Sequence, residues 1–155
     1  MCEPGIINDK NVKDITLPVR CIKKVIKFEG KNLELWLMTP SPAFAKLNKI
    51  IVTDRFFNEF IKMEQVALIY HEKYHQRLTT LLKRILLEFG GKKRAMWSEE
   101  FSADRYAVRK SSKKAVLSFL KRASVYYKKG IVEYNSKTHP PIQERIKRVD
   151  QYEDS

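Results

Sequence analysis

The sequence has few of the features that hold secreted or membrane-embedded proteins together. Its 155 residues include two cysteines, Cys2 and Cys21, and neither belongs to a C-x-x-C motif. Two cysteines do not make a disulfide framework. An alternative role for Cys2 is to bind a metal ion and so keep the site inactive. No apolar run approaches the roughly 18–20 residues of a membrane span, and the N-terminus lacks the basic-then-apolar pattern of a signal peptide. We therefore expect a soluble, cytoplasmic protein without a transmembrane segment.

Acidic residues are also scarce relative to basic ones. The chain has 18 Asp and Glu against 31 Lys and Arg, which gives a formal net charge of +13. Such a charge can serve an anionic partner, either nucleic acid or a membrane surface. The cations, however, are spread along the chain in short groups such as Lys23-Lys24 and Lys113-Lys114. We therefore expect a solvated basic surface with no specific nucleic-acid partner, although peripheral membrane contact stays open.

Strand patterns come first in the chain. Residues 19–28 and 33–38 are rich in β-branched and alternating apolar residues and flank a turn signal at 29–32, so they predict a β-hairpin. Residues 43–45 are expected to form a short extended edge segment, and 49–53 predict a further strand. A hydrophobic content of 43% suits one globular domain spanning residues 1–155.

Helical patterns follow the strands. A helical pattern begins near Phe56 or Glu59, and one long helix is expected from about Gln65 to Phe89, ended by Gly90-Gly91. Further helices are expected at 99–110 with Ser98 as cap, at 113–129 with Ser111 or Ser112 as cap, and at 142–150. The domain then divides into a loose lead-in (1–14), mainly strands (15–53), mainly helices (54–150) and a tail (151–155). This order predicts an α+β fold in which a small antiparallel or mixed sheet packs on a helical subdomain.

The long predicted helix contains the motif H-E-x-x-H as His71-Glu72-Lys73-Tyr74-His75. Residues four apart on a helix share one face, so both imidazoles can bind one metal ion, while Glu72 can reach a water on that metal. Two histidines on a solvated face are the alternative. The helical stripe that contains them is mostly apolar, however, and an unpaired buried imidazole is costly. The pattern is typical of zinc peptidases.

A catalytic zinc needs a third protein ligand. The metzincin position, six residues beyond His75, is Leu81, and the position used by SprT-type proteins is Thr79. A carboxylate on the following helix is the remaining source. Glu100 and Asp104 are four apart and share a helix face. One of them can bind the metal, and the other can accept the N–H of a ligand histidine.

Three motifs in this order resemble the gluzincin metallopeptidases of the HtpX and CAAX prenyl protease type. They are H-E-x-x-H, Glu100-x-x-Ala103-Asp104, and the segment Thr138-His139-Pro140-Pro141 with Arg145-Ile146. Residues 42–45 are similar to the edge strand of that family, and 50–53 to the strand that leads to its active-site helix. The resemblance covers about residues 41–149. Because no membrane span is predicted, the chain resembles the small soluble members called minigluzincins, some of which are similar to zymogens.

The resemblance implies a role for each matched residue. Glu100 is the third zinc ligand beside His71 and His75, and Asp104 is the partner of His71. Glu72 is the general base, and His139 helps to stabilise the oxyanion. Arg145 supports that site or orders the nearby acids. The backbone of Ala43, Phe44 and Ala45 pairs with an extended substrate.

These roles predict a zinc-dependent endopeptidase that hydrolyses a peptide or an unfolded protein, with Zn²⁺ as its cofactor. Two alternatives stay open. One is a latent zinc peptidase whose cleft is blocked by residues 1–14 or 150–155. The other is a basic protein that binds nucleic acid or a membrane surface and carries a zinc site.

Overall fold

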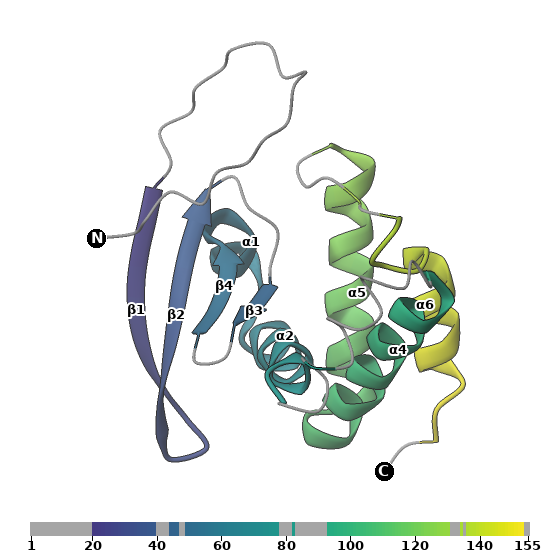
Figure 1. Ribbon diagram of the computed structural model, residues 1–155, viewed down its shortest axis with the longest axis horizontal. Coiled ribbons are helices and arrows are strands. Elements are labelled where there is room, and N and C mark those ends of the chain that lie inside the picture. The colour runs from purple at the N-terminus through teal and green to yellow at the C-terminus, as the bar shows by residue number, and fades with distance from the viewer. Residues whose placement is uncertain are drawn as a thin grey trace.

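The computed structural model describes residues 20–39, 44–46, 49–77, 82, 93–130, 134 and 136–153. Four strands come first and helices follow, with the sheet on one side and the helices α2, α4, α5 and α6 on the other (Figure 1). The predicted α+β fold is confirmed. The element bounds are β1 Arg20–Phe28, β2 Lys31–Thr39, β3 Phe44–Lys46, β4 Lys49–Thr53, α1 Asp54–Glu59, α2 Lys62–His75, α4 Lys93–Lys110, α5 Lys113–Lys128 and α6 Ile142–Asp150.

The sheet is mixed, with strand order β1-β2-β4-β3. β1 and β2 form the predicted antiparallel hairpin, in which Phe28 pairs with Lys31. Glu29 and Gly30 both have positive φ, 50° and 73°. Two successive positive φ angles are the signature of a type I′ turn, whose twist matches that of the strands it joins.

The other two strands extend the sheet toward the helices. β4 runs parallel to β2, so that Leu35 pairs with Ile50. β3 pairs antiparallel with β4 and ends the strand order, which confirms the predicted edge position of Phe44 and Ala45. Ala43 lies outside the described residues. Since α2 contacts both β3 and β4, the edge of the sheet lies beside the helix that carries H-E-x-x-H.

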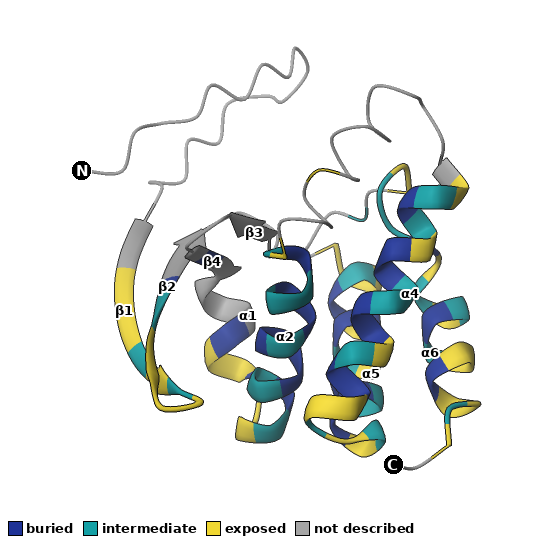
Figure 2. Ribbon diagram, turned by 60° about the horizontal axis from the view of Figure 1, so that its bottom comes forward, coloured by how far each residue is buried: buried dark blue, intermediate teal, exposed yellow. Residues whose placement is uncertain are grey.

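The helix α2 lies between the sheet and the pair α4 and α5 (Figure 1). Buried residues of α2, α4 and α5 face the interior (Figure 2). Leu68 of α2, Val116 and Leu120 of α5 and Val149 of α6 are at most 2% exposed and belong to one apolar cluster. Burying an aliphatic side chain of this size contributes about 1.5–3 kcal/mol. This cluster fixes the helices whose polar side chains form the site below.

The prediction of one continuous helix from about Gln65 to Phe89 is wrong, because α2 ends at His75. Phe89 lies outside the described residues. α2 begins at Lys62, where the Glu64 carboxylate accepts a hydrogen bond from the Ile61 N–H at 3.1 Å. Because that acceptor satisfies a free N–H of the first turn, it serves as a cap. The helix ends at His75, and the N–H of Gln76 donates to the carbonyl of Glu72 at 3.2 Å. Gly90-Gly91 lies outside the described residues.

The later helices agree with the sequence more closely. Ser112 caps α5 by accepting a hydrogen bond from the Ala115 N–H at 3.1 Å, and α6 has its predicted bounds. The predicted start of α4 is wrong, because the helix begins at Lys93 and Ser98 lies inside it. There the Ser98 carbonyl accepts a hydrogen bond from the Ser102 hydroxyl at 2.9 Å. Among the described residues, none of the helices is long and apolar enough to cross a bilayer.

Candidate metal centre

Two helices bring three potential metal ligands together. His71 and His75 lie one turn apart on α2, and Glu100 lies on α4, which packs against α2. The exposed fractions of these residues are 4%, 2% and 1%. Burying two imidazoles and a carboxylate is costly unless they are paired or bind a metal. Together they form a group that could hold a metal ion. The helical spacing predicted the two histidines, and the family resemblance predicted Glu100 as the third member.

The distances between the ligand atoms fit a small ion. His71 Nε2 lies 3.3 Å from His75 Nε2 and 3.3 Å from Glu100 Oε2. His75 Nε2 lies 3.3 Å from Glu100 Oε1. Atoms held about 2.0–2.1 Å from one ion at tetrahedral angles are about 3.3–3.4 Å apart. The three side chains therefore already have the separation that tetrahedral coordination requires.

Asp104 holds the first of these ligands in place. Its Oδ1 lies 2.9 Å from His71 Nδ1, and it comes from the turn of α4 that follows Glu100. When His71 Nδ1–H donates to Asp104, the Nε2 lone pair faces the carboxylate of Glu100. Two acceptors at that distance repel one another unless a proton or a metal cation lies between them. By contrast, Nδ1 of His75 is buried without a hydrogen-bond partner in the described part of the chain.

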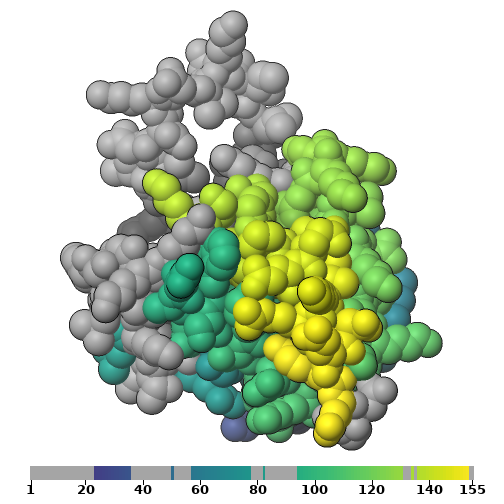
Figure 3. All heavy atoms as spheres, turned by 90° about the vertical axis from the view of Figure 1, so that its right-hand side faces the viewer, coloured from purple at the N-terminus to yellow at the C-terminus, as the bar shows by residue number. Residues whose placement is uncertain are grey.

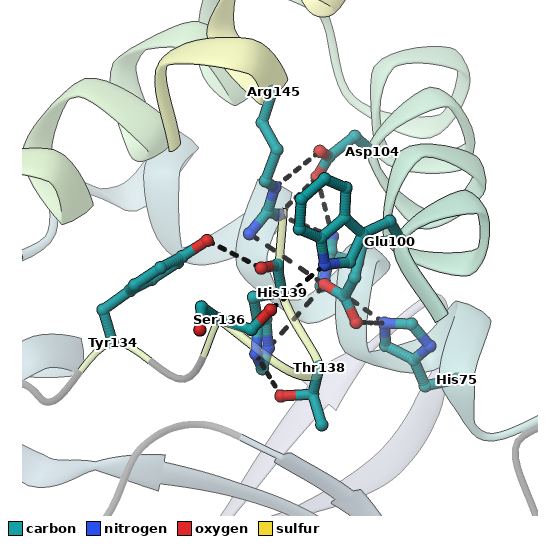
Figure 4. A network of polar contacts seen from close by, with 10 residues as sticks. His75, Glu100, Asp104, Tyr134, Ser136, Thr138, His139 and Arg145 are labelled. Carbon is teal, nitrogen blue, oxygen red and sulfur yellow. Dashed lines mark hydrogen bonds and ion pairs between the residues drawn. The ribbon is translucent and has the colours of Figure 1, made fainter. Parts of the chain in front are cut away.

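Arg145 completes this support from α6. Its Nε donates to Asp104 Oδ2 at 2.8 Å, and its Nη2 donates to Asp104 Oδ1 at 2.7 Å. Its Nη1 lies 3.9 Å from Glu100 Oε2. Of the two roles expected for Arg145, supporting the oxyanion or ordering the acids, this geometry favours the second. Figure 4 shows Arg145, Asp104 and Glu100 together.

The charges around the site shift the pKa values of its members. Burial opposes the charge of His71, but hydrogen bonds to Asp104 and Glu100 raise its pKa to about 9. Burial also opposes ionisation of Asp104, yet Arg145 and His71 lower its pKa below the usual value. Burial also raises the pKa of Glu100, but His75 and His71 outweigh this effect and hold that pKa well below its usual range. Both acids are therefore ionised at neutral pH, as metal binding requires.

Glu72 lies next to His71 on α2 and is 6% exposed. Its charge acts on Tyr127 of α5 together with other charges of the site. Burial raises the pKa of Tyr127, Arg145 lowers it, and the charges of Glu100 and Glu72 raise it. Glu72 is therefore a buried carboxylate next to the candidate ligand His71 on the same helix.

His139 reaches the centre from the loop between α5 and α6. Its Nε2 lies 3.8 Å from Glu100 Oε2, and 32% of its side chain is exposed. Its Nδ1 lies 2.8 Å from the hydroxyl oxygen of Thr138. Figure 4 shows the imidazole facing Glu100 from the side opposite Asp104 and Arg145. His139 is thus both near the ligands and accessible from solvent.

Two aromatic residues that sequence reasoning missed hold this loop. The Tyr134 hydroxyl donates to the carbonyl of His139 at 2.7 Å, and the Trp97 indole N–H donates to the carbonyl of Ser136 at 3.3 Å. Both donors bind backbone carbonyls, which carry no sequence signal. The sequence shows only that a loop carries His139, and this does not identify Tyr134 or Trp97 as the residues that hold the loop.

Several residues with predicted roles lie outside the described part of the chain. They are Cys2, Pro42, Ala43 and residues 1–14 of the proposed blocking segment. For Phe44 and Ala45 the structure describes the strand and its pairing but not the side chains. Comparisons with protein-family models, curated proteins and solved structures found no match to this chain. The support for a function therefore comes from the site itself.

Proposed function

We propose that this chain is a zinc-dependent endopeptidase in which Glu72 is the general base. The observation that carries the proposal is the buried triangle of His71, His75 and Glu100, whose nearest ligand atoms are 3.3 Å apart. Glu72 lies on the same helix as the two histidines. This combination supports hydrolysis at a metal rather than a purely structural site, since structural zinc sites use four protein ligands and mostly thiolates.

The ligand set favours zinc over harder ions. Two imidazoles and one carboxylate are a known catalytic zinc set, whereas calcium and magnesium prefer oxygen ligands alone. Bound there, zinc would supply Lewis acidity and a water that loses its proton near neutral pH. The buried position of the three ligands suits this role, because a low local dielectric strengthens such electrostatic effects.

The protein residues then divide the proton transfers between them. Glu72 accepts the proton of the attacking water and delivers it to the leaving amine. The Thr138 hydroxyl lies 2.8 Å from His139 Nδ1. When this hydroxyl is the donor, the proton of the neutral imidazole is on Nε2. From there His139 donates to the oxygen on which negative charge develops. Its partial exposure allows contact with a substrate carbonyl.

Asp104 and Arg145 act as positioning residues. Asp104 accepts the proton of His71 Nδ1 and so fixes the tautomer whose Nε2 can bind metal. Arg145 holds Asp104 through two hydrogen bonds. Neither group touches the reacting atoms, so each contributes through the orientation of His71.

The sheet edge supports a peptide as the substrate. β3 is the last strand in the order and pairs with β4 alone among the described strands. An extended peptide can add to such an edge through backbone hydrogen bonds. Because β3 contacts α2, a peptide paired with Ala43, Phe44 and Ala45 would pass beside the helix that carries H-E-x-x-H. An unfolded polypeptide is therefore the favoured substrate class.

The test is cleavage of casein by zinc-loaded wild-type protein and by Glu72→Gln at matched zinc content. The proposal expects cleavage by the wild type and a loss of at least about 100-fold in the variant, since general base catalysis contributes about 10²–10⁴-fold. Equal cleavage by both proteins would contradict it. Zinc-loaded protein that cleaves casein only after residues 1–14 are removed would support the latent alternative.

A further inference from the structure

A second surface, away from the three metal ligands, lies between α4 and α6. Three adjoining hollows of about 460, 420 and 650 Å³ share Arg105 and Tyr152 in their walls. We call them together the α4–α6 groove. Figure 3 faces this side of the molecule, where α6 in yellow lies beside α4 in teal to green. Glu100 and Asp104 are buried and do not line these hollows, so the groove is separate from the metal centre.

The groove has an excess of positive charge. Its walls carry five cationic side chains among the described residues, namely Arg94, Arg105, Arg109, Lys147 and Arg148. Two acidic side chains, Glu144 and Glu153, also line it. All five cationic residues are exposed. A concave surface of one dominant sign concentrates ligands of the opposite sign.

Two of these arginines are held against aromatic rings. The guanidinium carbon of Arg148 lies 3.8 Å from the ring centre of Phe101, and that of Arg105 lies 4.9 Å from the ring centre of Tyr152. These ring contacts restrict the position of both guanidinium groups. Such a fixed fork matches a carboxylate or phosphate in two parallel hydrogen bonds and loses little side-chain entropy on binding. Arg148 also donates from Nη2 to Glu144 Oε1 at 3.1 Å, an exposed pair that an acidic ligand would have to share or replace.

We propose that the α4–α6 groove binds an acidic segment of a polypeptide through these arginines. A nucleic acid fits less well for two reasons. Tyr152 carries Arg105 and also packs against the hydrophobic core, which leaves little of its ring for a base. Glu144 and Glu153 would repel a phosphate backbone that is charged at every nucleotide, whereas a peptide can place a neutral or basic residue there.

The groove also reaches the loop that carries His139. Trp97 lines it, and its indole N–H binds the carbonyl of Ser136, three residues before His139. One wall of the groove is therefore bonded to the loop that carries His139. Binding itself does not depend on the proposed peptidase activity. A preference for cleaving acidic substrates would depend on it.

The test is fluorescence anisotropy with a fluorescein-labelled peptide of alternating Glu and Ala. Every protein carries Glu72→Gln, so that the peptide stays intact whether or not the wild type is a peptidase. The groove variant is Arg105→Gln with Arg148→Gln. The matched control is Lys114→Gln with Lys121→Gln, which removes the same charge from exposed positions on α5. Circular dichroism and zinc content establish that each variant is folded.

We expect the groove variant to bind the peptide at least tenfold more weakly than the parent and the control to change binding less than twofold. A second variant, Arg94→Gln with Lys147→Gln, leaves the stacked pairs intact and should also weaken binding. Equal weakening by groove and control variants would overturn the proposal. The proposal would also be overturned if the parent protein bound labelled oligo(dT) more tightly than the peptide and the groove variant lost this oligo(dT) binding. If the groove does not bind the peptide, the casein assay still tests the proposed peptidase activity independently, because its proteins keep the native groove residues.

Discussion

Arg145 on α6 donates two hydrogen bonds, of 2.8 and 2.7 Å, to the carboxylate of Asp104 on α4. Asp104 in turn holds Nδ1 of His71 on α2 at 2.9 Å. Three helices are therefore connected through one buried chain of charges that ends at a candidate metal ligand. Because a buried charge pair is sensitive to the loss of either member, this connection makes the C-terminal helix part of the site.

Replacing Arg145 with Met should lower the free energy of unfolding of the metal-free protein by about 3–5 kcal/mol, since it leaves buried charge uncompensated. Urea denaturation measures this change. Lys147→Met, at an exposed position of the same helix, should change the free energy by less than about 0.5 kcal/mol. A loss below about 1 kcal/mol in Arg145→Met would show that Arg145 does not hold the site together.

Asp104→Asn should weaken zinc binding about 10–100-fold, because such outer partners fix the orientation and basicity of a ligand histidine. Competition with a chromogenic chelator measures the affinity. Ser102→Ala, on the same helix but with its hydroxyl bound to the Ser98 carbonyl, should leave the affinity unchanged. Equal affinities of wild type and Asp104→Asn would remove Asp104 from the site.

The metal-free protein should lose stability as the pH rises from 6.5 to 9. The pKa of folded His71 is raised to about 9, above its ordinary value of 6.5. Its protonated form therefore stabilises the fold fully below pH 6.5, and this stabilisation disappears as the pH rises through 9. Urea denaturation at a series of pH values should show the decline in wild type and a weaker one in His71→Gln. A flat profile would contradict the raised pKa.

Zinc binding should show the opposite trend. A proton must leave His71 before its Nε2 can bind metal, so the apparent affinity should rise about tenfold for each pH unit up to about pH 9. Chelator competition between pH 6.5 and 9 tests this. An affinity that levels off near pH 6.5 would show that His71 titrates as an ordinary histidine.

Tyr134→Phe should reduce casein cleavage about fivefold with zinc content unchanged. The substitution removes the hydrogen bond to the His139 carbonyl, and one such bond is worth about 1 kcal/mol. Tyr70→Phe is the matched control, since the Tyr70 hydroxyl binds Glu29 in the hairpin turn. If both variants keep full activity, Tyr134 does not position His139.

Local patterns were enough to predict much of this site. The four-residue spacings of His71 with His75 and of Glu100 with Asp104 depend only on helix geometry, and the structure brings these four side chains together. The turn at Glu29-Gly30 was predictable because glycine adopts the positive φ angles that such turns require. These features follow from short-range rules that the sequence carries directly.

Features that depend on tertiary contacts were not predictable in the same way. The end of α2 at His75 has neither Gly nor Pro beside it, and apolar residues continue at helical spacing beyond it. α4 begins before Ser98, so Ser98 is a residue type that often caps helices but lies inside this one. The hydrogen bond from Tyr134 to the loop of His139 joins a side chain to backbone, so no residue pattern reveals it.

The most direct test of the metal centre is the zinc content of the purified chain after equilibration with zinc and removal of loosely bound ions. We predict about one zinc per chain for wild type and for Glu99→Gln, and far less for Glu100→Gln, the same change one residue further along α4. Far-UV circular dichroism checks that all three are folded. Wild-type protein that retains no zinc, or Glu100→Gln that retains as much as wild type, would contradict the assignment of His71, His75 and Glu100 as ligands.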